Sequence, residues 1–386
     1  MKIEDQNHYQ VNWINGMKIN KEHFIEAENA FTQRTQLMNS KNINEFNYGL
    51  LPQTGLERSI EMSLSIDGQG TVKIQLQKCS AITSGGHLIY ITKEISELLE
   101  RNNRVIETDY KIEGETEACY IIISVNPYQR IPLGDSLPNE EPPRHPFVIP
   151  EYKLSIVPKS ETNDEELGKY HITLGKIRFD ETTNAELAEE FIPPCTSIQS
   201  HPDLIHTYQE IGVFYNRIEN YSMLIIQKIY QKKQSNELAK MVLTLSQSVL
   251  QYIGGMLSEY RLNDKYAHPV VLISKLMSLA RVIKNNLDVY NGTGKEELLN
   301  YLSDWCDLNQ GAFENTLIDL IELQYQHTDI NTSLNHVSEF TRLMHTLFKK
   351  LSELDYIGKK LDPNIFVKEE VIAEKDSKPR RSFLWD

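Results

Sequence analysis

The sequence has 386 residues, of which 40% are hydrophobic and 24% are charged. A chain of this length and composition can form two domains with hydrophobic cores of their own, which argues against a disordered protein. Its 54 acidic and 40 basic residues give a formal net charge of −14. Because no long basic stripe offsets this charge, nucleic acid is not expected as a partner.

The four cysteines, Cys79, Cys119, Cys195 and Cys306, lie far apart. They form none of the close Cys or His spacings of zinc sites, so we expect buried, reduced thiols and no metal or other cofactor. The N-terminal residues lack the basic and apolar regions of a signal peptide, and no run reaches the ~18 apolar residues of a membrane span. The protein is therefore expected in the cytoplasm, without direct membrane insertion.

The first patterned stretch is VNWINGMKINKEHFIEAENAF, residues 11–31. Val11 and Trp13 share one face of a predicted short strand, and Asn15-Gly16 supplies a tight turn. The next residues are expected to return antiparallel to this strand. The sequence therefore predicts a small β-hairpin ahead of the first helix.

A helix is expected directly after this hairpin, with Asn20 as its N-cap. Phe24, Ala27 and Phe31 fall on one stripe of that helix. His23 lies in the first turn, where a neutral imidazole can bond a neighbouring backbone group. A structural role for His23 is favoured over a catalytic one.

Between residues 59 and 180 the apolar residues alternate with polar ones, the pattern of strands with one buried face. No helical pattern is seen between these strands, and polar turns join them. The sequence therefore predicts an antiparallel β-sandwich. The expected strands are residues 60–66, 72–76, 87–91, 118–125, 152–157 and 170–179.

The connection at residues 126–150 is rich in proline. Proline fixes φ and lacks a backbone donor, so this segment is predicted to be a loop or a sheet edge. Long loops are often functional. Two uses are open: contact with a partner protein, or a lid over the active site of a hydrolase.

After FIPPCTSIQSHPD, residues 191–203, the apolar period changes from strand to helix. Apolar residues then recur in steps of three and four, a narrow a/d stripe of the kind that lets helices supercoil. The first such stripe contains Leu204, Tyr208, Ile211, Tyr215, Ile218, Ile225 and Ile229. Further helical stripes follow within residues 238–256, 272–283, 298–305, 313–321 and 337–354, so the C-terminal half is predicted to be a helical bundle.

Enzyme signatures are absent from the sequence. It contains no G-x-S-x-G, no H-E-x-x-H and no G-x-G-x-x-G between a strand and a helix. The segment NGTGKEE fails as a phosphate loop, because Val289 replaces the first glycine and Glu296 the Ser or Thr that binds magnesium. No catalytic residue is assigned, and a non-enzymatic protein is expected.

The opening stretch resembles the N-terminal signature of the TssK family, baseplate proteins of type VI secretion systems, which reads V-x-W-x-E-G-M-x-L-x-P-Q-H-F. The matching residues are Val11, Trp13, Gly16, Met17, His23 and Phe24, and the departures are Asn15, Ile19, Lys21 and Glu22. FIPPCTSI is similar to the family's junction motif, and HPVVLISKLMSLA to its H-P-x-x-L-Y-x-x-L-x-x-L-A segment. The resemblance covers roughly residues 8–325.

The resemblance implies an α+β multidomain protein: a β-sandwich shell like the shoulder of phage receptor-binding proteins, then a helical neck. We place the shell at residues 1–198, the neck at 199–357 and a tail at 358–386. It further implies a homotrimer whose shell binds TssF/TssG-like wedge subunits and which is recruited to the inner face of the envelope. The expected shell contacts are Trp13, Gly16, Met17, His23, Phe24 and Arg144, and the expected trimer seam is Tyr208, Ile211, Tyr215, Ile218 and Ile225.

The C-terminal region departs from the family pattern, which continues into a separate α/β head that docks on the membrane complex. Here one more helix and the tail KDSKPRRSFLWD are expected instead. The substitute anchor would be Arg380, Arg381, Phe383, Leu384 and Trp385, and its membrane-complex component need not be the standard one. The alternative is a phage-tail-like receptor-binding protein or another structural protein of a contractile injection machine.

Overall fold

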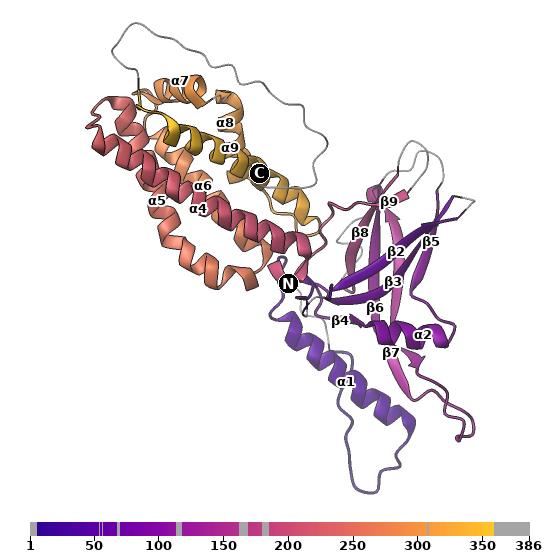
Figure 1. Cartoon of the computed structure of the whole chain (residues 1–386). Helices are drawn as coiled ribbons and strands as arrows, with labels where there is room; N and C mark the ends of the chain where they lie inside the picture. Colours follow the sequence, from indigo (N-terminus) through magenta and orange to yellow (C-terminus); the bar gives the residue numbers. More distant parts are fainter. Residues whose placement is uncertain are drawn as a thin grey trace. The chain divides into compact units, whose positions relative to one another are not determined.

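A computed structural model describes residues 6–53, 55, 57–67, 70–112, 118–161, 169–179, 185–306 and 309–358. The chain divides into two compact units. The first comprises Met1–Pro202 with His327–Asn331, and the second Asp203–Gln326 with Thr332–Asp386. Antiparallel sheets come first in the chain and helices follow, so the predicted α+β multidomain fold is confirmed (Figure 1).

Strand β3 organises the first sheet, because it pairs antiparallel with every other strand of that sheet. Val72, Ile74 and Leu76 alternate along it and are buried, as the sequence period predicts. The strands are β1 (Gly49–Leu50), β2 (Ile60–Ile66), β3 (Thr71–Ile82), β4 (Leu88–Ile91) and β5 (Glu107–Lys111).

The second sheet has the order β7-β6-β8-β9 and packs on the first. Its strands are β6 (Cys119–Leu133), β7 (Phe147–Pro158), β8 (His171–Phe179) and β9 (Ala185–Leu187). At Gly175 of β8 a Cβ atom would lie 2.7 Å from Met62 Cε of β2, so this glycine lets the two sheets approach. The predicted β-sandwich is therefore present, with Ile121 and Ile123 in its core.

The sequence missed a helix inside the sandwich, α2 (Lys93–Arg101). Thr92 Oγ1 caps it by accepting from Ile95 N at 3.2 Å, and Leu99 is buried. The cap follows β4 directly, so the sequence contains no turn or loop residues that would mark the start of a helix. The expectation of strands without an intervening helix was wrong here.

The hairpin predicted for residues 11–19 is also wrong, since no strand lies between residues 6 and 20. The Asn15-Gly16 turn is present, and Gly16 adopts φ +80°, which favours glycine. A two-stranded hairpin alone is marginally stable in water. The segment packs instead against the next helix, α1 (Lys21–Ser40).

The proline-rich connection forms a sheet edge, as one of the two expectations had it. Beyond Ser124 the described part of β6 pairs with β7 alone, in pairs such as Pro132 with Val148 and Arg130 with Pro150. Residues 134–146 join the two strands. Pro132 and Pro150 are tolerated because each lies where its strand has a neighbour on one side only, and Pro138, Pro142, Pro143 and Pro146 lie in the loop between the strands.

The second unit consists of helices, whose register follows the predicted stripes (Figure 1). None of the described helices is long and apolar enough to cross a membrane. The helices are α4 (Pro202–Gln231), α5 (Glu237–Leu262), α6 (Pro269–Asp288), α7 (Lys295–Cys306), α8 (Gln310–Ile321) and α9 (Ile330–Glu353). Short 3-10 turns lie at Lys159–Glu161, Ile198–Ser200 and Asp264–Tyr266.

The trimer seam assigned from the sequence needs a correction. Ile211, Tyr215, Ile218 and Ile225 are each at most 1% exposed, because the chain's own atoms cover them. Tyr208 is half-buried, and its ring stacks on Tyr260 of α5 with centroids 4.6 Å apart. The a/d stripe therefore packs α4 within its own unit. An intrachain bundle and an oligomer need the same period, so the sequence alone did not separate them.

A short segment from late in the chain completes the first unit. His327 Nε2 lies 2.8 Å from the Tyr48 carbonyl oxygen, and the two rings stack edge to face at 4.7 Å. Ile330 N donates to the Ile192 carbonyl at 3.1 Å. Residues 327–331 thus belong with the sandwich, although the helices α4 to α8 precede them in sequence.

Candidate functional site

Helix α1 begins with a reciprocal cap. Asn20 Oδ1 accepts from His23 N, and His23 Nδ1 accepts from Asn20 N, both at 3.2 Å. This capping box satisfies two backbone donors at the helix start. The predicted N-cap is confirmed, and so is the predicted bond between the His23 imidazole and the backbone.

Polar side chains hold α1 against the N-terminal segment and the sandwich. Gln33 Oε1 accepts from Asn7 N at 3.0 Å and from His8 N at 2.8 Å. Gln36 Nε2 donates to the Gly85 carbonyl at 2.7 Å. Both glutamines are only 4% exposed, so the buried side of this helix is largely polar. A charged contact adds to it, because Glu28 Oε2 lies 2.6 Å from Arg130 of β6.

The apolar side chains of this segment point into solvent instead. Phe31 is 73% exposed, Phe24 is 56% exposed and Trp13 is 50% exposed. We call this set the N-terminal apolar face; it consists of Trp13, Ile14, Ile19, Phe24, Phe31 and Met38. Phe24, Ala27 and Phe31 do lie along one helix, as predicted. Phe24 and Phe31 do not face the core, however, as the apolar side of an amphipathic helix normally does.

Ring contacts position Trp13 and Phe24 of the N-terminal apolar face. The Trp13 ring lies 6.1 Å from the Phe24 ring and 6.2 Å from the His23 ring, both tilted. These separations are typical of favourable aromatic pairs. The capping box fixes His23 and the first turn, so it also positions the indole. Gly16 allows the turn between them, and Met17 beside it is half-buried.

The other residues assigned from the sequence do not join this group. Arg144 lies in the connection between β6 and β7, where its Nε is 2.5 Å from Glu140 Oε2. Such an exposed pair contributes little to stability. The C-terminal anchor residues, Arg380, Arg381, Phe383, Leu384 and Trp385, lie outside the described residues.

The signature therefore has two parts with different uses. Gly16 and His23 shape the backbone, whereas Trp13 and Phe24 present apolar surface. Sequence reasoning missed Ile14, Ile19 and Met38 as members of the same face. One signal was available, because Phe24, Phe31 and Met38 are spaced by seven residues and so lie one above another on a helix.

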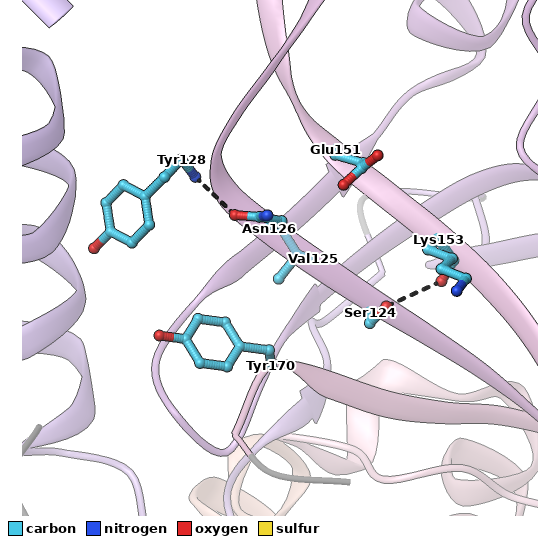
Figure 2. A pocket seen from close by; sticks show the side chains of 7 residues that line it. All are labelled: Ser124, Val125, Asn126, Tyr128, Glu151, Lys153 and Tyr170. Carbon is cyan, nitrogen blue, oxygen red and sulfur yellow. Dashed lines mark hydrogen bonds between the residues drawn. The ribbon is translucent and has the colours of Figure 1, made fainter.

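An open hollow of about 400 Å³ lies on the second sheet (Figure 2). Figure 2 shows Tyr128 and Tyr170 on one side and Glu151 with Lys153 on the other. Glu151 is the single acid among the described lining residues. The hydrolase considered from the sequence predicts a deep pocket with perturbed acids beneath residues 126–150, and this open hollow with one acid in its lining does not match that expectation.

The thiols are poorly placed for nucleophilic chemistry. All four cysteines are buried, as expected. Burial raises the pKa of Cys79 and of Cys306 to about 12. These two thiols therefore stay protonated at neutral pH. In the part of the chain that the structure describes, no three His, Cys, Asp or Glu side chains come together as a metal site.

No protein-family model matches the sequence, and no characterised protein matches it in sequence. Solved structures do show likeness. A crystal structure of TssK is 14% identical with a TM-score of 0.49, over 89% of this chain and 70% of that chain. TssK from the type VI secretion system of EAEC, in complex with a nanobody, is 12% identical with a TM-score of 0.46, over 84% of this chain and 99% of that chain.

A cryo-electron microscopy structure of the type VI secretion system TssK-TssF-TssG baseplate subcomplex also aligns. It is 13% identical with a TM-score of 0.48, over 90% of this chain and 99% of that chain. At these identities and TM-scores the likeness by itself supports no conclusion about function.

Proposed function

We propose that this protein is a structural subunit of a type VI secretion baseplate, a homotrimeric adaptor that links TssF/TssG-like wedge subunits to a membrane-anchored complex. One observation supports the proposal most directly. The N-terminal segment has the TssK-like signature, and its large apolar residues Trp13 and Phe24 lie on the surface instead of in the core.

The exposed arrangement suits a protein partner. Trp13 and Phe24 lie ring to ring at 6.1 Å, and adjoining apolar side chains that are exposed to water on a monomer chiefly mark a place where something binds. Tryptophan and other aromatic side chains dominate the binding energy of protein interfaces. The rigid cap at Asn20 holds Trp13 and Phe24 in place before binding, which lowers the entropy cost of association.

The remaining roles follow from this assignment. The wedge subunits bind the shell at the N-terminal apolar face, with Arg144 as a second contact. The trimer lies in the cytoplasm and is recruited to the inner face of the envelope, where Arg380, Arg381 and Trp385 reach the membrane-complex component. The protein catalyses no reaction and takes no cofactor.

The proposal is tested by changing Trp13 to Ala and measuring capture of co-expressed TssF/TssG-like subunits. We expect affinity to fall on the order of 30-fold or more, the loss typical of an interface hot spot. Trp305→Ala is the matched control, because Trp305 is 51% exposed and Trp13 is 50% exposed. The melting temperature should change little for either variant.

Two results would contradict the proposal. One is full wedge-subunit binding by a Trp13→Ala/Phe24→Ala double variant. The other is loss of binding only in proportion to a lower melting temperature, which would make Trp13 a structural residue of the first unit.

A further inference from the structure

The turn ahead of α1 has an asparagine followed by a glycine at its centre. Met17 N donates to the Ile14 carbonyl at 3.2 Å, so Asn15 and Gly16 are the two central residues of this turn. Both are exposed. Gly16 has φ +80°, and a Cβ there would meet nothing within 4 Å. Water can therefore reach both the Asn15 carboxamide and the Gly16 backbone nitrogen.

An asparagine can react with the glycine that follows it. The glycine backbone nitrogen gives its proton to solvent and attacks the asparagine Cγ, and the new C–N bond closes a five-membered succinimide ring. The Cγ–Nδ2 bond breaks, and the nitrogen takes up a proton from solvent and leaves as ammonia. Glycine has no Cβ to hinder this approach. Because both groups belong to one chain, ring closure is an efficient unimolecular step.

Water then opens the succinimide at either of its two carbonyl carbons. Opening at one carbon leaves aspartate in place of the asparagine. Opening at the other gives isoaspartate, in which the main chain runs through Cγ and is longer by a single carbon atom. Either product has a carboxylate where the chain has the neutral Asn15. No oxidant or reductant takes part.

Ring closure requires the turn to open, and the turn at residues 14–17 is weakly held. Among the residues that the structure describes, residues 9–19 make a single backbone–backbone hydrogen bond, the one between Met17 and Ile14. Segments with few hydrogen bonds and exposed backbone open at a low cost in free energy. The Asn15-Gly16 pair therefore reaches the reactive geometry readily.

The second Asn-Gly pair of the chain, Asn291-Gly292, is held more firmly. It is also exposed, and Gly292 has φ +71°. Asn291 N donates to the Asp288 carbonyl and Lys295 N to the Tyr290 carbonyl, both at 3.0 Å. Lys295 Nζ also lies 2.7 Å from Asp288 Oδ1. These contacts tie the turn to the helices on both of its sides.

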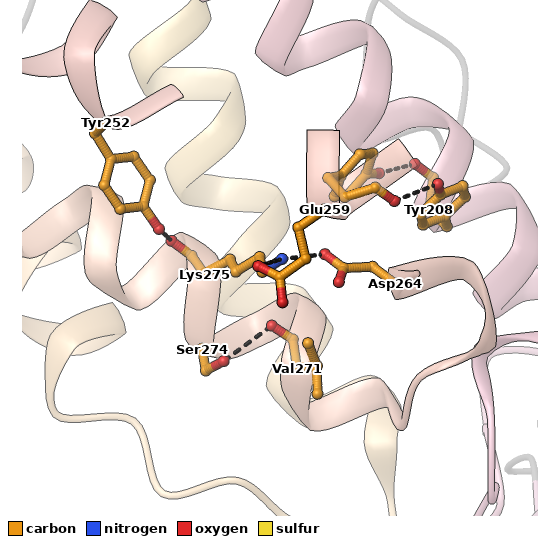
Figure 3. A network of polar contacts seen from close by, with 8 residues as sticks. Tyr208, Tyr252, Glu259, Asp264, Val271, Ser274 and Lys275 are labelled. Carbon is orange, nitrogen blue, oxygen red and sulfur yellow. Dashed lines mark hydrogen bonds and ion pairs between the residues drawn. The ribbon is translucent and has the colours of Figure 1, made fainter. Parts of the chain in front are cut away.

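Side chains likewise fix the turn between α5 and α6. Lys275 of α6 lies 2.6 Å from Asp264 and 3.0 Å from Glu259, between the two carboxylates (Figure 3). Tyr252 Oη donates to the Lys275 carbonyl at 2.6 Å. Turns of the second unit are thus tied by ion pairs. The structure therefore ranks two Asn-Gly pairs that look equivalent in the sequence, with Asn15 as the more reactive.

We propose that Asn15 is a site of spontaneous deamidation, and that an unassembled chain with isoaspartate at this position binds the wedge subunits weakly. The effect on binding rests on the function proposed above. Trp13 precedes the turn and Phe24 follows it, and their rings lie 6.1 Å apart. An extra main-chain carbon between them displaces the indole from Phe24. A bound wedge subunit keeps the turn closed, so the reaction limits how long an unassembled chain can join a baseplate.

The test ages the purified full chain in mildly alkaline buffer, which speeds loss of the Gly16 amide proton. Peptide mapping by mass spectrometry measures conversion at Asn15 and Asn291. We expect conversion mainly at Asn15, and an affinity of the aged chain for purified TssF/TssG-like subunits that is lower on the order of 10-fold. Asn15→Gln should keep its affinity, because glutamine would have to form a less favourable six-membered ring. Asn291→Gln is the control and should age like the native chain.

Two further measurements separate the added charge from the longer main chain. Asn15→Asp adds the carboxylate alone, and when freshly made it should bind like the native chain. Protein isoaspartate methyltransferase, with S-adenosylmethionine as methyl donor, returns isoaspartate to the succinimide and so to aspartate. Treatment with this enzyme should restore binding by the aged chain.

Conversion at Asn291 that equals or exceeds conversion at Asn15 would overturn the assignment, and so would an aged chain that binds as tightly as a fresh one. Weak binding by Asn15→Asp, or no restoration by the methyltransferase, would overturn the role of isoaspartate. A fresh native chain that binds no wedge subunit would overturn the proposed function and the effect on binding, whereas conversion at Asn15 is measured independently by mass.

Discussion

Helices α1 and α9 are of similar length and bury opposite kinds of side chain. Helix α9 buries apolar residues such as Val337 and Phe340 and exposes charged ones. Helix α1 buries Gln33 and Gln36 and exposes Phe24 and Phe31. The difference shows that an apolar stripe in a sequence does not by itself say whether the stripe faces the chain's own core or solvent.

The physical reason lies in how each helix is held. Burial of apolar area stabilises α9 against its neighbours, at about 25 cal/mol per Å² removed from water. The Gln33 amide accepts from Asn7 N, the Gln36 amide donates to the Gly85 carbonyl, and an ion pair joins them in holding α1; each hydrogen bond contributes only about 1 kcal/mol. Helix α1 can therefore keep its aromatic side chains available.

The largest expected effect is on the free energy of unfolding, and it is measured with a matched pair of phenylalanine-to-alanine variants. Phe340→Ala in α9 removes a side chain that is 0% exposed and lies 6.4 Å, ring to ring, from Phe214. It should cost about 3–5 kcal/mol of unfolding free energy. Phe31→Ala in α1 should change it by no more than about 0.5 kcal/mol. Urea unfolding followed by circular dichroism measures both, and equal losses would refute the comparison.

The next effect concerns the polar anchor of α1. Gln36→Leu removes the donor that Gln36 gives to the Gly85 carbonyl and leaves a buried acceptor unpaired. The expected cost is about 1–3 kcal/mol, confined to α1 and its contacts. Amide hydrogen exchange should show faster opening of α1 while β3 stays protected. Arg34→Leu, on the exposed side of the same helix, is the control and should leave the exchange of α1 unchanged.

The last effect is a dependence on pH at the turn that receives α1. His87 is 3% exposed and stacks on Tyr170 at 4.3 Å, and burial lowers its pKa from 6.5 to about 4. The unfolded chain therefore takes up a proton first as pH falls, so stability is lost between about pH 6.5 and pH 4.

Between pH 7 and pH 5 the expected loss from His87 is about 2 kcal/mol. The pH dependence of urea unfolding measures it, and His87→Gln should flatten that part of the profile. An unchanged slope in the variant would assign the acid sensitivity to other groups.

Contacts between residues close together in the sequence could be predicted from the sequence. The Asn20 cap, the bond from His23 to the backbone and the Asn15-Gly16 turn depend on residues within a few positions of one another. The alternating strands and the helical register were likewise predictable, because one side of each element had to be apolar. The position of α2 was missed, since its cap Thr92 directly follows the last residue of β4.

The sequence did not predict which side of a helix faces the rest of the chain. The side of α1 that faces the sandwich is set by Gly85, which lies 49 positions from Gln36 in sequence. The a/d stripe of α4 fitted a trimer seam and an intrachain core equally well, and burial of Tyr215 and Ile218 decided for the core.

The segment at residues 327–331 bears on how the protein is made. Its His327 bonds the carbonyl of Tyr48 across 279 positions of sequence. During synthesis at about 5–20 residues per second, the ribosome must translate all of α4 to α8 before this part of the sandwich can close. The first unit therefore lacks these contacts until residue 331 has been made, and a premature stop before His327 should yield a fragment that is prone to aggregation.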